Sequence, residues 1–233
     1  MTTIKPNNKP YLNIRFTLKI KQDSKRLLQL ALLFVALFCS TVSARASEFE
    51  NWTFIGVNTE WKKMEFSVSS ANFFIQGGGY FLNHTQLSLD FPSKNSFSLG
   101  VGYKQEYVKF PLKWRTEYRP MLHLYYTKIW GHFEFRDRSR WEFRFMDGEL
   151  IHRYRNQIQL SFNKFNVITP YLSTEFSFYL KEPGYSRQRT VLGAGIPIKN
   201  LYLNLFLGHQ VDKIIPGEWY NKFMMGTGLS FSF

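Results

Sequence analysis

The most constraining feature of this sequence is a two-residue alternation of polar and apolar side chains. Between His132 and Phe145, the even positions carry charged or imidazole side chains and the odd positions carry mostly aromatic ones. A period of two is that of a β-strand, in which successive side chains point to opposite faces. The stretch is longer than the five or six residues of a usual soluble strand. We therefore expect an all-β protein built from unusually long strands.

The same alternation recurs in four later segments. Each has one polar and one apolar face, and together they cover residues 150–162, 168–180, 201–212 and 220–233. Alternating segments of about ten residues joined by short turns are typical of a transmembrane β-barrel, with lipid outside and a polar lumen inside. A secreted sandwich or a soluble barrel remains the alternative, because its strands also alternate. We predict a transmembrane antiparallel up-and-down β-barrel.

The first 46 residues have a different composition from the rest of the chain. They hold eight basic side chains against one acidic residue, Asp23, and the run from Leu27 to Cys39 is almost wholly apolar. The segment ends in Ala44-Arg45-Ala46, a small-x-small sequence. This pattern predicts a signal peptide over 1–46, cleaved after Ala46, and one barrel domain over 47–233. An uncleaved amphipathic anchor is the rival interpretation.

Charge and cysteine content exclude several classes of function. The chain has 30 Lys and Arg against 17 Asp and Glu, a net charge of +13, but much of this excess lies in the first 46 residues. The remaining arginines interleave with acids, so no nucleic-acid partner is expected. The one cysteine, Cys39, lies in the predicted signal peptide, which argues against disulfides, thiolate metal sites and cysteine nucleophiles. No cofactor is expected.

A hairpin is predicted around Met146-Asp147-Gly148-Glu149. The Asp-Gly pair readily adopts the positive φ angles of a type I′ turn. Pairing 146 with 149 sets Glu142 opposite Arg153, and polar residues then face polar residues along both strands. A slip of one residue would place the polar face of one strand opposite the apolar face of the other, so this agreement supports the hairpin.

The hairpin before it has two open registers. Pairing Glu117 with Glu142 would oppose like charges, which is unfavourable. A slide of two residues in either direction would set Glu142 opposite Arg115 or opposite Arg119. We predict one of these two registers.

About twelve strands are predicted, with ten as the alternative. Counted along the chain, they cover residues 52–61, 63–70, 72–81, 84–91, 97–107, 113–127, 131–145, 150–162, 168–180, 186–198, 201–212 and 220–233. An even number is expected of a bacterial single-chain barrel. The run Gly77-Gly78-Gly79 is interpreted as a bulge or close-packing point, because no helix follows that would make it a phosphate-binding loop.

With both termini on the periplasmic side, the turns fall into two sets. Periplasmic turns are then expected at 128–131, 163–167 and 199–200, and outer loops at 108–112, 146–149, 181–185 and 213–219. No loop is long enough for a plug domain. Aromatic residues near strand ends are expected to form interfacial girdles; they include Trp114, Trp130, Trp219 and Tyr220.

Two sequence features resemble known proteins. The final stretch, Gly226 to Phe233, looks like the signal by which barrel-assembly machinery recognises outer-membrane proteins. The region 131–233 contains Arg138-x-Arg140-x-Glu142-x-Arg144, Tyr154-Arg155-Asn156, Thr169-Pro170-Tyr171 with Glu175, and Arg187-x-Arg189 before Gly193. In that order, these motifs resemble an uncharacterised bacterial outer-membrane family catalogued as domain of unknown function 2490. The resemblance implies an outer-membrane barrel and brings no activity with it.

The predicted lumen is rich in arginine. The inward basic residues are Arg115, Arg119, Arg136, Arg138, Arg140, Arg144, Arg153, Arg155, Arg187 and Arg189, countered by Glu117, Glu134, Glu142 and Glu175. Arginine rings on a pore wall favour anions and can hold carboxylate or phosphate groups. We therefore predict a small anion-preferring channel. The alternative is a closed structural or lipopolysaccharide-binding barrel, in which these side chains only satisfy one another.

An enzyme is not expected. An outer-membrane lipid hydrolase needs a nucleophile and a histidine on the lipid-facing wall or rim, and no such Ser–His spacing stands out. His152 is the only candidate near an outer rim, and His123 with His132 is a weak metal pair. We expect a monomer whose partners are outer-membrane lipids, lipopolysaccharide, small anionic solutes and, through Phe233, the barrel-assembly machinery.

Overall fold

The computed structural model describes residues 48–77, 79–92, 96–110, 113–165, 167–180, 184–215 and 218–233. Within them the chain forms eleven strands: β1 (Glu48–Trp61), β2 (Met64–Ile75), β3 (Gly79–Pro92), β4 (Phe97–Lys109), β5 (Trp114–Trp130), β6 (Phe133–Met146), β7 (Glu149–Phe162), β8 (Thr169–Tyr179), β9 (Gly184–Ile198), β10 (Leu201–Ile215) and β11 (Glu218–Ser232). The predicted signal peptide over 1–46 lies outside the described residues. No helix among the described residues is long and apolar enough to cross a membrane.

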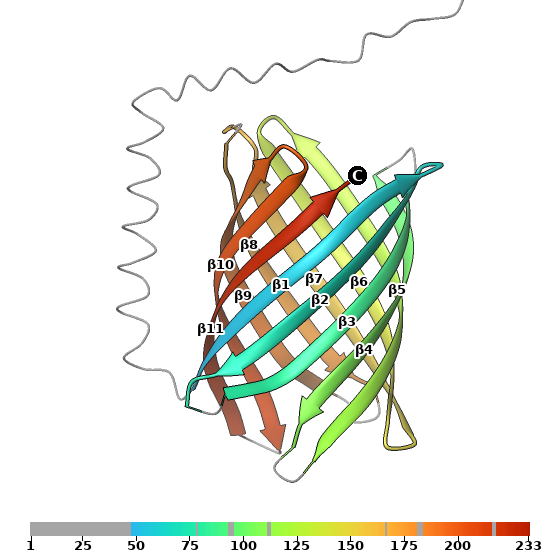
Figure 1. Ribbon diagram of the computed structural model, residues 1–233, viewed down its shortest axis with the longest axis vertical. Coiled ribbons are helices and arrows are strands. Elements are labelled where there is room, and N and C mark those ends of the chain that lie inside the picture. Colours follow the sequence, from blue (N-terminus) through green and yellow to red (C-terminus); the bar gives the residue numbers. More distant parts are fainter. Residues whose placement is uncertain are drawn as a thin grey trace, which may run out of the picture. The chain divides into compact units, whose positions relative to one another are not determined.

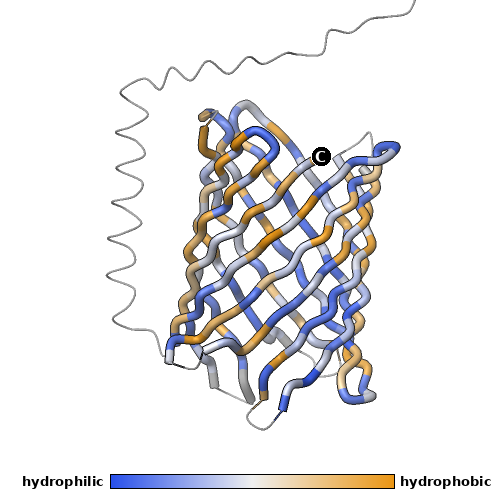
Figure 2. The backbone as a smooth tube through the Cα atoms, in the orientation of Figure 1, coloured by the Kyte–Doolittle hydropathy of each residue, from blue (hydrophilic) through white to orange (hydrophobic). Residues whose placement is uncertain are grey.

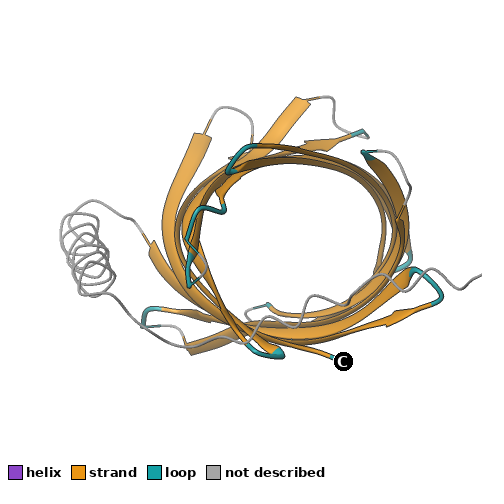
Figure 3. Ribbon diagram, turned by 90° about the horizontal axis from the view of Figure 1, so that it is seen from above, coloured by secondary structure: helices purple, strands orange, loops and turns teal. Residues whose placement is uncertain are grey.

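The strands form a closed up-and-down barrel (Figures 1 and 3). Each strand pairs with its neighbours in the sequence in antiparallel orientation, and β1 closes the barrel by pairing with β11 in parallel orientation, from Glu48 opposite Lys222 to Asn58 opposite Ser232. The all-β barrel is confirmed, but the expectation of twelve strands, or of any even number, is wrong for the described chain. An odd number is possible because a parallel ladder also satisfies the backbone groups of both edge strands.

The difference in strand number arises between residues 63 and 92. Three strands were expected there, whereas β2 continues from Met64 to Ile75 and β3 follows from Gly79. Nothing in Ser67–Ala71 favours a turn over a strand that continues. Gly77 follows β2 in the turn, with a φ angle of +77°, and Gly79 begins β3, with a φ angle of +71°. Glycine adopts such angles without steric cost, which is why the chain reverses there. The interpretation of these glycines as a bulge is therefore wrong.

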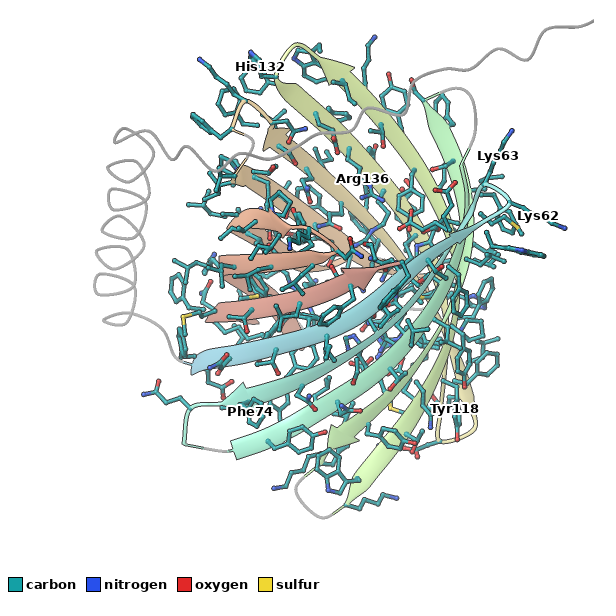
Figure 4. The ribbon with its side chains drawn as sticks, turned by 45° about the horizontal axis from the view of Figure 1, so that its top comes forward. Lys62, Lys63, Phe74, Tyr118, His132 and Arg136 are labelled. Atoms are coloured by element: carbon teal, nitrogen blue, oxygen red, sulfur yellow. The ribbon has the colours of Figure 1, made fainter. Side chains whose placement is uncertain are left out.

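The two predicted sets of turns do lie at opposite ends of the barrel. One end, which we call the Phe233 end, carries the turns after β5, β7 and β9 and the carboxyl terminus; it also carries the β1–β2 turn at Lys62 and Lys63 (Figures 1 and 4). The other, the Glu48 end, carries the start of β1 and the turns after β2, β4, β6, β8 and β10. With an odd number of up-and-down strands, the first strand starts at one end of the barrel and the last strand finishes at the other. The assumption that both termini of the barrel lie on one side is therefore wrong.

Inside and outside have inverted polarity compared with a soluble protein. Leucines of the outer wall, such as Leu99, Leu122 and Leu172, expose more than half of their surface, whereas Glu142 and Glu117 in the interior are almost fully buried. Figure 2 shows the alternation of hydrophobic and hydrophilic residues along the strands. Trp114, Trp130 and Trp219 are exposed near strand ends. Tyr220 lies opposite the inward-facing Asp212, so Tyr220 is on the lumen face of its strand and not on the outer wall.

The two predicted hairpins have different outcomes. In the β6–β7 hairpin, Glu142 pairs with Arg153 and Arg140 with Arg155, and the turn has positive φ at Asp147 and Gly148, so this prediction is confirmed. In the β5–β6 hairpin, Met121 lies opposite Glu142, so both predicted registers are wrong. The two-residue turn at Gly131 and His132 sets this register, and the charges find partners diagonally between these two neighbouring strands.

Candidate functional site in the barrel interior

Glu142 on β6 is the centre of the largest ion cluster in the described interior. Its carboxylate has no exposed surface and lies 2.7 Å from Nε of Arg153 and 2.9 Å from Nη1 of Arg155. Arg140 and Arg119 complete the cluster, with N–O distances of 3.6 and 3.9 Å. One buried carboxylate therefore balances arginines from three strands, which keeps a dense group of positive charges folded inside the barrel.

Two further carboxylates extend this cluster. Glu117 on β5 accepts a hydrogen bond of 2.8 Å from Nη2 of Arg144 and one of 2.8 Å from Nε of Arg119. Glu175 on β8 accepts one from Arg155 and lies within 4 Å of Arg138 and Arg189. The acids thus serve as bridges between arginines of neighbouring strands.

The interactions continue around most of the barrel. Arg189 donates to Gln210 at 2.8 Å, Gln210 donates to Asp212 at 2.6 Å, and Lys222 lies between Asp212 and Glu50 at 3.5 and 2.7 Å. We call this continuous chain the ionic belt; it comprises Glu106, Arg119, Glu142, Arg155, Glu175, Arg189, Gln210, Asp212, Lys222 and Glu50. It takes one or more side chains from every strand from β4 through β11 and from β1.

An aromatic cluster fills the interior beside β1, β2 and β11. Trp52, Ala71, Phe73 and Met224 are buried together, and Phe54 and Phe206 pack against them. The two regions meet where the guanidinium of Arg189 lies 4.5 Å above the Trp52 ring and the Trp52 indole donates to Glu50 at 2.7 Å. Belt and cluster together fill the middle of the lumen with packed side chains.

A cavity of about 890 Å³ lies on the Phe233 side of the belt. Its lining includes Asn163, Thr169 and Tyr202, which are next to the turns of that end. Its basic side chains are Arg136, Arg138, Arg155 and Arg189, and its acids are Glu134 and Glu175. Figure 4 labels Arg136 on β6, whose guanidinium lies 4.8 Å above the ring of Tyr125. Amide and hydroxyl groups cover much of the remaining wall, so the cavity offers both charge and neutral hydrogen-bonding groups to a polar solute.

A second cavity of about 240 Å³ lies on the Glu48 side. It is lined by Arg153, Ser177, Tyr179, Ser186, Arg187, Asp212 and Lys213. Three cations face one carboxylate here, and Asp212 is already paired with Arg187. The volume suits a small anionic group.

The structure places the predicted lumen residues in different surroundings. Arg115 forms a partly exposed pair with Asp147 at the Glu48 end, and Glu134 lies near the Phe233 end, where Asn163 donates to it at 3.3 Å. Arg144 is connected to the belt through Glu117, which contacts Arg119. The other predicted arginines and glutamates belong to the belt, to its direct contacts or to the two cavities.

The predicted set of lumen residues lacks several charged residues of the described interior, among them Glu50, Lys104, Glu106, Asp212 and Lys222. The alternation does put Asp212 and Lys222 on the polar faces of the strands predicted over 201–212 and 220–233. Lys104 and Glu106 alternate with Tyr103 and Tyr107, so the same two-residue period could have found them. Glu50 lies before the first predicted strand. The predicted strand begins at residue 52, four residues after the start of β1, and therefore leaves Glu50 out.

Three of the histidines have different surroundings in the described chain. His123 is buried against Tyr125, with its Nδ1 3.2 Å from the tyrosine hydroxyl, whereas His132 lies in the β5–β6 turn (Figure 4). His152 packs its ring against Phe143. Among the described residues, no group of three or more potential metal ligands occurs, and no hydrogen bond joins a serine to a histidine.

Two comparisons with known proteins complete this description. A family described as "Protein of unknown function (DUF2490)" matches residues 49–221, which begin in β1 and end in β11. A search of curated proteins found no match. The resemblance seen in residues 131–233 is thereby confirmed and extended over most of the barrel.

Proposed function

The chain belongs to the DUF2490 family, whose function is unknown, and we propose from its own residues that it is an outer-membrane β-barrel with a pathway for small anions. Residues 47–233 form the barrel after removal of the signal peptide over 1–46. The protein acts as a monomer, without cofactor and without enzymatic activity.

Several features support an outer-membrane location. Exposed Leu, Phe, Val and Ile side chains cover the outer wall, and tryptophans lie near the strand ends. Such a surface is unfavourable in water and suits a lipid bilayer with aromatic girdles at its interfaces. Outer-membrane lipids and lipopolysaccharide are then the direct neighbours of the barrel. The strand ending in Phe233 is proposed to be recognised by the barrel-assembly machinery.

One observation carries the proposed pathway. The cavity of the Phe233 end and the cavity of the Glu48 end both have arginine walls. On each of β7, β8 and β9, one inward residue lines the first cavity and the next inward residue lines the second. Arginine-lined pores favour anions because the positive wall replaces part of the anion's hydration. A local rearrangement of one side-chain layer would connect the two cavities.

A closed barrel is the second candidate, and the ionic belt favours it. Every acid of the belt contacts at least one cation in the structure. A fully paired interior can be purely structural, holding the barrel in shape. In that case the cavity of the Phe233 end would serve as a binding site for an anionic solute or lipid headgroup rather than as part of a pathway.

Conductance distinguishes the two candidates. The chain over 47–233 would be refolded, inserted in a planar bilayer, and measured for single-channel steps and for reversal potential across a KCl gradient. Discrete steps with a reversal potential of the sign for chloride preference are expected. Folded, heat-modifiable protein that produces no steps at any voltage would reject the pathway and favour the closed barrel.

A further inference from the structure

The two cavities are separated by a septum of three strands. On β7, Arg155 lines the large cavity and Arg153 the small one; the corresponding pairs are Glu175 and Ser177 on β8, and Arg189 and Arg187 on β9. Each pair consists of residues i and i+2, which are consecutive on the inner face of a strand. The septum is therefore one side chain thick along this wall.

Glu175 is the only acid among the six septum residues. It is 4% exposed, and its carboxylate contacts guanidinium groups from three strands: Arg155 through a hydrogen bond, Arg138 at 3.5 Å and Arg189 at 3.7 Å. Arginines in this arrangement form a binding site for a carboxylate or a phosphate group. The site is filled by a carboxylate of the protein itself.

The small cavity offers donors on the other side of this carboxylate. Ser177 is 1% exposed, and its Oγ has no hydrogen-bond partner among the described residues. Ser177 lies opposite Arg155 on β7 and opposite Arg187 on β9. Arg153, which lies opposite Tyr179, lines the small cavity together with Ser177 and Arg187. Since a buried hydroxyl without a partner is unfavourable, this group is available to a ligand that enters the cavity.

We infer that Glu175 is an internal anion that occupies the crossing point of the pathway, and that a small carboxylate or inorganic anion crosses by replacing it. When the entering anion takes the place of the Glu175 carboxylate, it is held on the side of the large cavity by Arg138, Arg155 and Arg189. Ser177, Arg153 and Arg187 receive it on the side of the small cavity. The inference rests on the proposed function, because it names the residue that closes the proposed pathway.

The first test compares Glu175→Gln with Glu117→Gln in planar bilayers. Both variants remove one buried, arginine-paired carboxylate, but Glu117 borders neither cavity. We expect Glu175→Gln to raise the chloride conductance at least about twofold and to increase chloride preference, because a negative charge leaves the crossing point. The Glu117→Gln variant should show a much smaller change.

The second test does not depend on the variant folding unaided. Glu175→Ala leaves a space beside three arginines and the large cavity, and sodium acetate is the probe that replaces the missing carboxylate. We expect acetate to increase the folded fraction of Glu175→Ala in a heat-modifiability assay more than sodium chloride at equal concentration does. Glu117→Ala, at a position that lines neither of the two described cavities, should gain no more from acetate than from chloride.

The outcomes separate this inference from the proposed function. A conducting natural protein whose two glutamine variants change equally would overturn the role of Glu175 and leave the pathway standing. A silent natural protein with a conducting Glu175→Gln variant would support the role of Glu175 and reject an open pathway in the natural protein. If all three proteins are silent and acetate has no specific effect on Glu175→Ala, both proposals are wrong.

Discussion

The two sides of the lumen are filled in different ways. From β5 to β9 the interior consists mainly of arginines and glutamates with partners on neighbouring strands. From β10 through β1 to β2, next to the belt residues Gln210, Asp212, Lys222 and Glu50, it consists mainly of aromatic rings, Met224 and glycines. A Cβ on Gly226 would lie 2.2 Å from the Phe206 ring, so this ring occupies the space that a side chain at 226 would need.

This difference shows two solutions to the same packing problem. Long flexible arginines fill a wide lumen, but each needs a carboxylate because a buried unpaired charge is unfavourable. Aromatic rings fill it without charge, but they need glycine on the neighbouring strand to fit. The two sides should therefore respond to different substitutions, and three predictions test this contrast in order of decreasing effect.

The largest effect is expected on the ionic side. Glu142→Ala leaves Arg153, Arg155, Arg140 and Arg119 without their shared carboxylate, so the free energy of unfolding should fall by about 3–5 kcal/mol. Urea unfolding in lipid vesicles, followed by tryptophan fluorescence, measures the change. Glu134→Ala near the Phe233 end is the control and should stay within about 0.5 kcal/mol of the natural protein. Equal changes in the two variants would contradict the central role of Glu142.

An intermediate effect is expected on the aromatic side. Gly226→Ala forces the new methyl group into the Phe206 ring, and overpacking of this kind lowers the free energy of unfolding by about 1–3 kcal/mol. Gly228→Ala, two residues along the same strand, is the matched control. Its Cβ would meet Phe54 and Asn204 at 3.5 and 3.6 Å, which are ordinary contacts, so little or no loss is expected. The same unfolding measurement compares them, and a larger loss for Gly228→Ala would show that the Phe206 contact is not decisive.

The smallest effect is expected at the Glu48 end, outside both regions. Arg115 and Asp147 form a 2.9 Å pair whose side chains are 34% and 50% exposed. A double-mutant cycle with Arg115→Ala and Asp147→Asn should give a coupling energy below about 1 kcal/mol, because water screens exposed pairs. Asparagine is chosen since it tolerates the positive φ of residue 147. A coupling energy as large as the loss in Glu142→Ala would mean that burial does not explain the contrast.

Much of the ionic side could be predicted from the sequence, and the aromatic side could not. Arg138, Arg140, Glu142 and Arg144 alternate with apolar residues, and the Asp147-Gly148 turn fixes the register with β7, so local patterns were sufficient. Trp52, Phe73 and Phe206 are apolar residues that face inward. Polarity alone assigns them to the lipid side. Only their packing against one another, and that of Phe206 against Gly226, reveals their position.

The sequence by itself determined the class of fold, the orientation of the charged faces and the β6–β7 hairpin, because these depend on a period of two and on turn residues close along the chain. The tertiary structure alone decided the number of strands, the parallel closure of β1 on β11, the register of β5 with β6 and the partners of each charge. These features depend on contacts between residues far apart in the chain. Side chains such as Glu175, Arg138 and Arg189 meet only when the barrel closes and its interior fixes which charges are neighbours.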